Sequence, residues 1–393
     1  MLMALNPTLI EPAESVVCDV RVRTRIVTSL DALDATTLQG WRALEDDAQH
    51  ANVYLSADFV VPSLRHLTPD LAFVLLISER WHDGTWQAIA LGIFTERRAS
   101  ATLFTRVLEA YRPPHGYLTG LLLHKECDAL AIRVLFDTFL RKQQRRWRAV
   151  GVACFALPLV LSDAAADEMR AINVAWHAYA DEPRATIRPA TVPVDFVRQH
   201  LSRNSRRNYE RKQRKLAALG DYQWRFVTGG SVTASTIDDF LALENTGFRR
   251  DAGTSLAAQP EHEAFFREMI ELMRQRDKVF FTEICLDGRV IASTCNLRSG
   301  AFAYAFKLGW NPDYADYSVG VLNELELVTH MPECLADIRH MDSGAMPGSF
   351  MERLWPDIDT LNAGYFTFGS ATTAFTSSIQ KVAALKRRLK RQS

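Results

Sequence analysis

Cysteine pairs and metal-ligand patterns are missing from this chain of 393 residues. Its six cysteines, at positions 18, 127, 154, 285, 295 and 334, form no C-x-x-C pair. A two-residue turn at Asp287-Gly288 would place Cys285 opposite Val290 and not opposite Cys295, which argues against a cross-strand disulfide. The ten histidines show neither H-E-x-x-H nor a zinc-ligand spacing. We therefore predict no metal, and reduced cysteines as in a cytoplasmic protein.

An excess of one charge and long apolar runs are also lacking. Lysine and arginine together number 46, as do aspartate and glutamate, so the formal net charge is zero and does not favour DNA as a partner. No apolar stretch reaches the length of a membrane span. The residues before Pro7 lack the basic start of a secretory signal peptide, which agrees with a cytoplasmic location. Neither a Walker-type phosphate loop nor a G-x-S-x-G hydrolase elbow is present.

The clearest pattern that is present runs from Lys278 to Asp342. Three β-branched and aromatic runs are separated by Asp287-Gly288 and Ser299-Gly300, which predicts two consecutive hairpins. A loop containing Gly320 then leads into a helix near 321–330 and a strand near 335–341. A helix N-terminus offers N–H groups to a pyrophosphate, and glycine permits its close approach.

The order of elements in this half repeats that of the first half. Each half is expected to contain a strand, two helices, three strands, a helix and a strand. In the first half we expect these elements near 19–28, 30–47, 57–66, 71–78, 87–95, 101–105, 125–146 and 149–156. In the second half they are expected near 222–228, 237–248, 261–276, 278–285, 290–297, 301–307, 321–330 and 335–341. Tyr, Gly and Leu also recur at matching offsets, in Tyr117, Gly120 and Leu122 and in Tyr317, Gly320 and Leu322.

This repeat predicts an α/β protein with two tandem lobes. Each lobe would hold a mixed, mainly antiparallel sheet flanked by helices. We place the boundary near residue 190, within a proline-containing linker at 180–195, so the lobes are 1–190 and 191–393.

Two basic segments lie in the second lobe. Between 196 and 220 there are eight arginines and lysines and a single acid, Glu210. Ser202 or Ser205 can cap a helix there and Gly220 can end it. The basic residues share one face, which is either solvated or a surface for phosphates of coenzyme A, of tRNA or of an anionic membrane. A second basic run at 381–391 suits the end of a last helix, where a solvated face is the simpler interpretation.

The first basic segment and several short motifs after it resemble a known family, the CelD/BioF2-like acetyltransferases. These are tandem members of the GCN5-related N-acetyltransferase (GNAT) superfamily, related to the FemABX peptidyltransferases. The similar segments are 201–220, 243–248, 287–292, 304–309, 318–322 and 342–344. The resemblance implies an acyl-CoA-binding C-terminal lobe, an acceptor groove between the lobes, and a role in cell-envelope or exopolysaccharide chemistry.

Two departures from the family pattern are visible. The family often carries a Tyr-Lys pair a few residues after Asp342-Ser-Gly344, where this chain has Phe350-Met351. The pyrophosphate loop of simpler acetyltransferases is Gln/Arg-x-x-Gly-x-Gly/Ala, whereas this chain has Tyr317-x-x-Gly320-x-Leu322. The second departure would alter or weaken donor binding.

Direct acyl transfer needs few side chains, because backbone N–H groups can polarise a thioester carbonyl. Asp342, at the end of a strand, is the first candidate base, with a structural carboxylate as the alternative. Tyr304 and Tyr317 are candidates to protonate the thiolate, or else they are packing residues. Glu244 lies on a helix that would border the acceptor site, and a solvated carboxylate is the favoured interpretation. The candidate donor-binding residues are Ser318, Val319, Gly320, Val321, Leu322, Lys307, Arg206 and Arg207.

Three functions remain open at this point. The first is transfer of an acetyl or other acyl group from coenzyme A to an amine or hydroxyl of a small molecule or envelope precursor. The second is a non-catalytic assembly or regulatory role, which both departures favour. The third is aminoacyl-tRNA-dependent peptidyl transfer, which the absence of a long coiled-coil arm disfavours. Peripheral membrane contact through the basic helices is compatible with all three.

Overall fold

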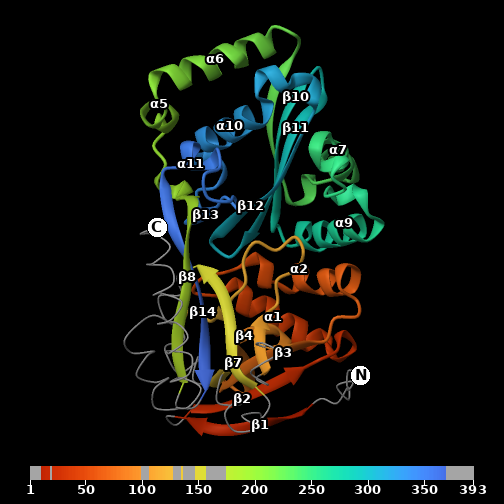
Figure 1. Ribbon diagram of the computed structural model, residues 1–393, viewed down its shortest axis with the longest axis vertical. Helices are drawn as coiled ribbons and strands as arrows, with labels where there is room; N and C mark the ends of the chain where they lie inside the picture. The colour runs from red at the N-terminus through yellow and green to blue at the C-terminus, as the bar shows by residue number, and fades with distance from the viewer. Residues whose placement is uncertain are drawn as a thin grey trace, which may run out of the picture. The chain divides into compact units, whose positions relative to one another are not determined.

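The computed structural model describes residues 10–17, 20–98, 106–126, 134–135, 147–155 and 174–368. The chain divides into two compact units (Figure 1). Unit 1 comprises Met1–Ala57, Asp70–Glu182 and Thr360–Ser393, and unit 2 comprises Asp58–Pro69 and Pro183–Asp359. The predicted division at residue 190 stays a prediction. In the structure the chain changes unit at residues 182–183 and also at 57–58, 69–70 and 359–360.

Unit 1 is a mainly antiparallel sheet. Its strands follow one another as β1-β2-β3-β4-β5-β7-β14, β5 and β7 pair in parallel, and β6 pairs with β4. Helix α1 (Ala35–Asp46) packs through Trp41, whose indole Nε1 donates to the Leu55 carbonyl at 2.8 Å. The strands are β1 Ile10–Val17, β2 Val20–Val27, β3 Phe73–His82, β4 Thr85–Arg98, β5 Arg106–Ala110, β6 Leu122–Leu123 and β7 Trp147–Phe155. Strands β8 (Val174–Ile187) and β14 (Asp357–Phe368) each run from one unit into the other.

The strands of unit 2 are mainly antiparallel and follow the order β13-β12-β11-β10-β9, and the end of β8 pairs with β13. Its strands are β9 Tyr222–Thr228, β10 Val279–Leu286, β11 Arg289–Ser299, β12 Phe302–Trp310 and β13 His340–Asp342. Its helices are α2 Ala57–Pro62, α5 Phe196–His200, α6 Arg203–Ala217, α7 Ala234–Glu244, α8 Gly247–Asp251, α9 Pro260–Arg274, α10 Val319–Cys334 and α11 Met351–Leu354.

Helices cover both faces of the unit 2 sheet, with α7 and α9 on one face and α10 on the other (Figure 1). Because helices cover both faces, successive side chains of β10 point alternately toward the two layers of helices. Phe281 packs edge-on against Phe240 of α7, and Phe280 belongs to the core that includes Leu327 of α10. Asn323 anchors α10 to the sheet, because its amide donates to the Thr282 carbonyl at 2.9 Å.

The predicted α/β class, with mainly antiparallel sheets flanked by helices, is confirmed. The first predicted hairpin has the expected register, since Cys285 pairs with Val290. Among the described residues, no group of histidine, cysteine and acidic side chains is arranged to hold a metal ion.

Several sequence-based expectations were wrong in detail. The linker predicted at 180–195 is strand up to Ile187, and neither β1 nor β14 was predicted. The strand predicted at 335–341 is only His340–Asp342. Leu335 and Ile338, whose apolar side chains suggested a strand, are fully buried but lie in a turn that precedes it. Ser202 caps α6 as expected, but the helix ends at Ala217 and not at Gly220. The predictions for 101–105, for most of 125–146 and for 381–391 lie outside the described residues.

Candidate functional site

Strands β12 and β13 pair over a short stretch and then part. Their parallel register joins Phe302 to His340 and ends where Tyr304 meets Asp342. Strand β12 continues to Trp310, while β13 stops. Phe306 forms a bulge just beyond the last pair, because Cys295 pairs with Lys307 and Asn296 with Ala305. One edge of β12 beyond Tyr304 therefore offers backbone groups that β13 does not pair with.

The N-terminus of α10 lies beside the far end of β12. A Cβ added to Gly320 would lie 3.1 Å from a Leu308 methyl group, so α10 and β12 approach closely there. Ser318 precedes the helix with φ 55° and ψ 45°, a left-handed conformation, and its side chain does not cap the helix. The first N–H groups of a helix have no intrahelical partner, so Val319–Val321 present donors and the positive end of a dipole.

A lysine from α6 reaches this helix start. The Lys212 ammonium donates to the Ser318 hydroxyl at 2.6 Å. Gln213, the next residue, donates to the Glu326 carboxylate at 2.6 Å and so ties α6 along α10. A cation, a helix N-terminus and a glycine are thus brought together, as in sites that bind phosphate groups. Lys212 was not among the predicted site residues, because it is one of several basic residues in the same segment.

Lys307, one of the predicted donor-binding residues, has a partner within the protein. The Lys307 ammonium lies 3.7 Å from the Glu244 carboxylate. Glu244 is buried and accepts from the Leu256 N–H at 2.8 Å, so the prediction of a solvated carboxylate was wrong. Helix α7 can end so close to β12 because Gly309 has no side chain: a Cβ there would lie 2.5 Å from the Glu244 nitrogen.

Asp342 lies at the end of β13, as predicted, and is fully buried. Its Oδ1 accepts from the Arg184 guanidinium at 3.4 Å and from the Gly344 N–H at 2.9 Å. Its Oδ2 has no hydrogen-bond partner among the described residues. Burial raises the pKa of Asp342, and the Arg184 charge opposes that rise. The Arg184 pair also fits the alternative interpretation of Asp342, as a structural carboxylate.

The two predicted tyrosines lie in different surroundings. Tyr304 is fully buried on β12 and pairs in register with Asp342. Tyr317 is half-buried in the turn before α10 and packs on the cluster that contains Val319 and Leu322. The structure therefore brings Tyr304 to Asp342 and Tyr317 to the start of α10.

Glu324 is a further candidate that sequence reasoning missed. It lies one turn after Gly320 on the face of α10 that meets β12. Its side chain is buried, and its Oε2 has no hydrogen-bond partner among the described residues. Burial raises the pKa of Glu324 to about 7. No sequence signal marks it, because the segment reads as an ordinary amphipathic helix.

The predicted pair Arg206 and Arg207 is split between two surfaces. Arg206 is half-buried, donates to the Arg198 carbonyl at 3.1 Å and lies 3.5 Å from Glu210. Arg207 is exposed on the outer face of α6. Of the two, only Arg206 lines the pocket described next.

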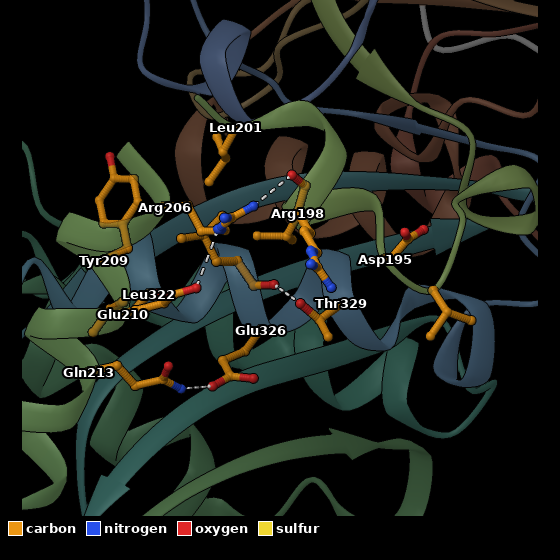
Figure 2. Close-up of a pocket in the computed structure, with 13 residues that line it drawn as sticks. Asp195, Arg198, Leu201, Arg206, Tyr209, Glu210, Gln213, Leu322, Glu326 and Thr329 are labelled. Atoms are coloured by element: carbon orange, nitrogen blue, oxygen red, sulfur yellow. Dashed lines mark hydrogen bonds and ion pairs between the residues drawn. The ribbon is translucent and has the colours of Figure 1, made fainter. Parts of the chain in front are cut away.

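A pocket of about 580 Å³ opens between α5, α6 and α10 (Figure 2). It adjoins the helix start, because Leu322 of α10 and Gln213 of α6 both line it. Apolar side chains and both signs of charge contribute to its walls. The lining residues are Val194, Asp195, Val197, Arg198, Leu201, Arg206, Tyr209, Glu210, Gln213, Leu322, Leu325, Glu326 and Thr329.

Comparison with known proteins identifies the type of domain that carries this site. Residues 203–350 match the family model described as Acetyltransferase (GNAT) domain. No curated protein matches the chain. The crystal structure of FemX is similar over 83% of this chain and 95% of its own, with 8% identity and a TM-score of 0.55.

Two further solved structures are similar at lower scores. A conserved protein of unknown function from Bacteroides thetaiotaomicron VPI-5482 is 11% identical with a TM-score of 0.49, over 85% of this chain and 97% of its own. A tandem GNAT protein from the clavulanic acid biosynthesis pathway is 11% identical with a TM-score of 0.38, over 88% of this chain and 98% of its own.

The GNAT match covers α6, α10 and the parting strands β12 and β13. Together with the similarity to FemX, it confirms the predicted tandem GNAT fold of the FemABX type. The narrower resemblance to the CelD/BioF2 group stays a prediction.

Proposed function

We propose that this protein transfers an acetyl or other acyl group from a coenzyme A thioester to an amine or hydroxyl group. The acceptor would be a small molecule or a cell-envelope precursor. The observation that carries the proposal is the start of α10, where Lys212 meets the uncapped turn at Ser318 beside the part of β12 that β13 does not pair with. The GNAT match over residues 203–350 supports it.

Each part of the site has a task in this reaction. The N–H groups of Val319–Val321 and the Lys212 ammonium would hold the donor's pyrophosphate. The edge of β12 beyond Tyr304 would receive the extended arm of the donor and direct an N–H group at the thioester carbonyl. Attack by the acceptor on that carbonyl carbon forms the new bond and breaks the C–S bond. No cysteine nucleophile is required.

Two protons must move in this reaction. The acceptor gives one to a carboxylate, for which Asp342 remains the predicted base. Glu324 is the second candidate, since an acid with a pKa near working pH is best suited to exchange protons. The departing thiolate takes the other proton, for which Tyr304 and Tyr317 remain the predicted donors.

Titration calorimetry with acetyl-CoA, and then with longer acyl-CoAs, tests the donor site. We expect Lys212→Gln to weaken binding about tenfold, which is the usual contribution of one charge-assisted hydrogen bond at a helix N-terminus. Lys215→Gln is the matched control, because Lys215 is exposed on the same helix and makes no contact with Ser318.

Equal affinities for the two variants would contradict the placement of the phosphates. No binding of any acyl-CoA to the unaltered protein would contradict the proposed reaction and favour the non-catalytic alternative. The exopolysaccharide setting and the cytoplasmic location are predictions from the sequence that this titration does not address.

A further inference from the structure

The outer face of α6 carries a row of arginines. Arg203, Arg207, Arg211 and Arg214 follow one another at intervals of four, four and three residues, so they share one side of the helix. All four are exposed. The opposite side of α6 faces the protein, where Leu216 is fully buried.

The charges of this row are not neutralised within the described part of the chain. Arg211 donates to the neutral Asn208 amide oxygen at 2.9 Å, and none of the four arginines forms an ion pair with another described residue. The only acid on the helix, Glu210, lies 3.5 Å from Arg206 instead. At a rise of about 1.5 Å per residue, the four charges extend over about 16 Å of the helix.

Exposed apolar residues flank the same helical segment in the sequence. Val194, just before α5, is 86% exposed, and Leu219, just after α6, is 51% exposed. These are among the most exposed large apolar side chains of the described residues. A chain of phosphates such as RNA would attract the arginines but would give no reason for exposed apolar groups at both ends of the segment that carries them. A lipid surface accounts for both, because cations meet its headgroups while apolar groups enter its interface.

We propose that α6 docks on the surface of an anionic phospholipid bilayer. The row of arginines binds lipid phosphates, and Val194 and Leu219 insert at the level of the headgroups. No helix among the described residues is both long enough and apolar enough to cross a membrane. Attachment through α6 would be peripheral, reversible and weakened by salt. It does not depend on the proposed acyl transfer.

Co-sedimentation of the full chain with vesicles tests this docking. We expect binding to vesicles of phosphatidylcholine with phosphatidylglycerol, little binding to phosphatidylcholine alone, and loss of binding in high salt. Each arginine near an anionic surface contributes about fivefold in affinity, so Gln at positions 203, 207, 211 and 214 together should weaken binding at least fiftyfold. The control replaces four exposed arginines elsewhere, Arg112, Arg250, Arg289 and Arg353, by Gln and should retain binding within about threefold.

A double variant of the two apolar residues distinguishes a bilayer from RNA. Val194→Gln with Leu219→Gln should weaken vesicle binding several-fold and leave any binding of bulk tRNA unchanged. Three results would overturn the proposal. They are absent or lipid-independent binding, equal loss in both arginine quadruple variants, and tRNA binding that is tighter than vesicle binding and equally sensitive to the four arginines.

Discussion

Replacing Arg184 by methionine is expected to lower the free energy of unfolding of unit 2 by about 3–5 kcal/mol at neutral pH. Arg184 is buried and holds the buried Asp342 carboxylate at the end of β13. Without the guanidinium, that carboxylate must either ionise without the main charge that stabilises it or remain protonated. Urea unfolding followed by tryptophan fluorescence measures the loss, and the buried Trp355, which lies in the same core as Met341, contributes to that signal.

The loss should depend on pH. Burial already raises the pKa of Asp342, and Arg184 is the main group that opposes the rise, so the variant's carboxyl has a still higher pKa. Below the pKa of an unfolded aspartate the group is protonated in both states, and the electrostatic part of the loss vanishes. The destabilisation should therefore be smaller at about pH 4 than at about pH 8.

A matched control is available a few residues along the chain. Arg188→Met removes a half-exposed arginine that pairs with Asp357 at 2.6 Å and with Asp359 at 3.3 Å. An exposed pair of this kind contributes about 0–1 kcal/mol, so the control should unfold close to the unaltered protein. If the two variants had equal free energies of unfolding, the ion pair between Arg184 and Asp342 would not stabilise the fold as described.

The unaltered protein is expected to become less stable as the pH rises, and replacing Glu324 by glutamine should abolish that change. Burial raises the pKa of Glu324 from 4.5 to about 7 in the folded chain. Between these values the folded state binds more protons than the unfolded state, so the free energy of unfolding falls with rising pH. The total fall is roughly 3 kcal/mol and is complete above the folded pKa. Urea unfolding at about pH 5 and about pH 9 measures it.

Glu333→Gln, on the same helix but exposed, should leave that pH dependence unchanged. An unaltered pH dependence in the Glu324→Gln variant would show that Glu324 is not the group responsible. Once an acceptor is known, the same variant separates two roles. A proton acceptor would change the acid limb of the pH–rate profile, whereas a structural residue would change stability alone.

The hairpins of unit 2 could be predicted because their signals are local. Asp287 and Gly288 both have positive φ, 50° and 75°, as the two central residues of a type I′ turn require, and the flanking residues are β-branched or aromatic. Gly320 was likewise identified from its place before a helix. Ser318 was also among the predicted donor-binding residues, but its left-handed conformation was not predicted, since nothing in its residue type indicates it.

Burial of charged side chains could not be predicted, because it depends on elements distant in the sequence. Glu244 is buried because Lys307 and the backbone of Leu256 surround its carboxylate. Strand β14 was missed since its first residues, Asp357-Ile-Asp-Thr360, lack the apolar run of a typical core strand. Strand β8 was missed because Pro183 suggested a linker, although the strand continues through it.

The pairing of β14 with β7 also sets the order in which the two units can be completed during synthesis. Leu361–Thr367 pair with Ala149–Phe155, so the sheet of unit 1 lacks a strand until the ribosome has passed residue 367. Unit 2 needs nothing beyond Asp359. A pairing between segments so distant in the chain also carries a large loop-closure cost and slows folding. The unit that the ribosome begins first is therefore the last one that it can complete.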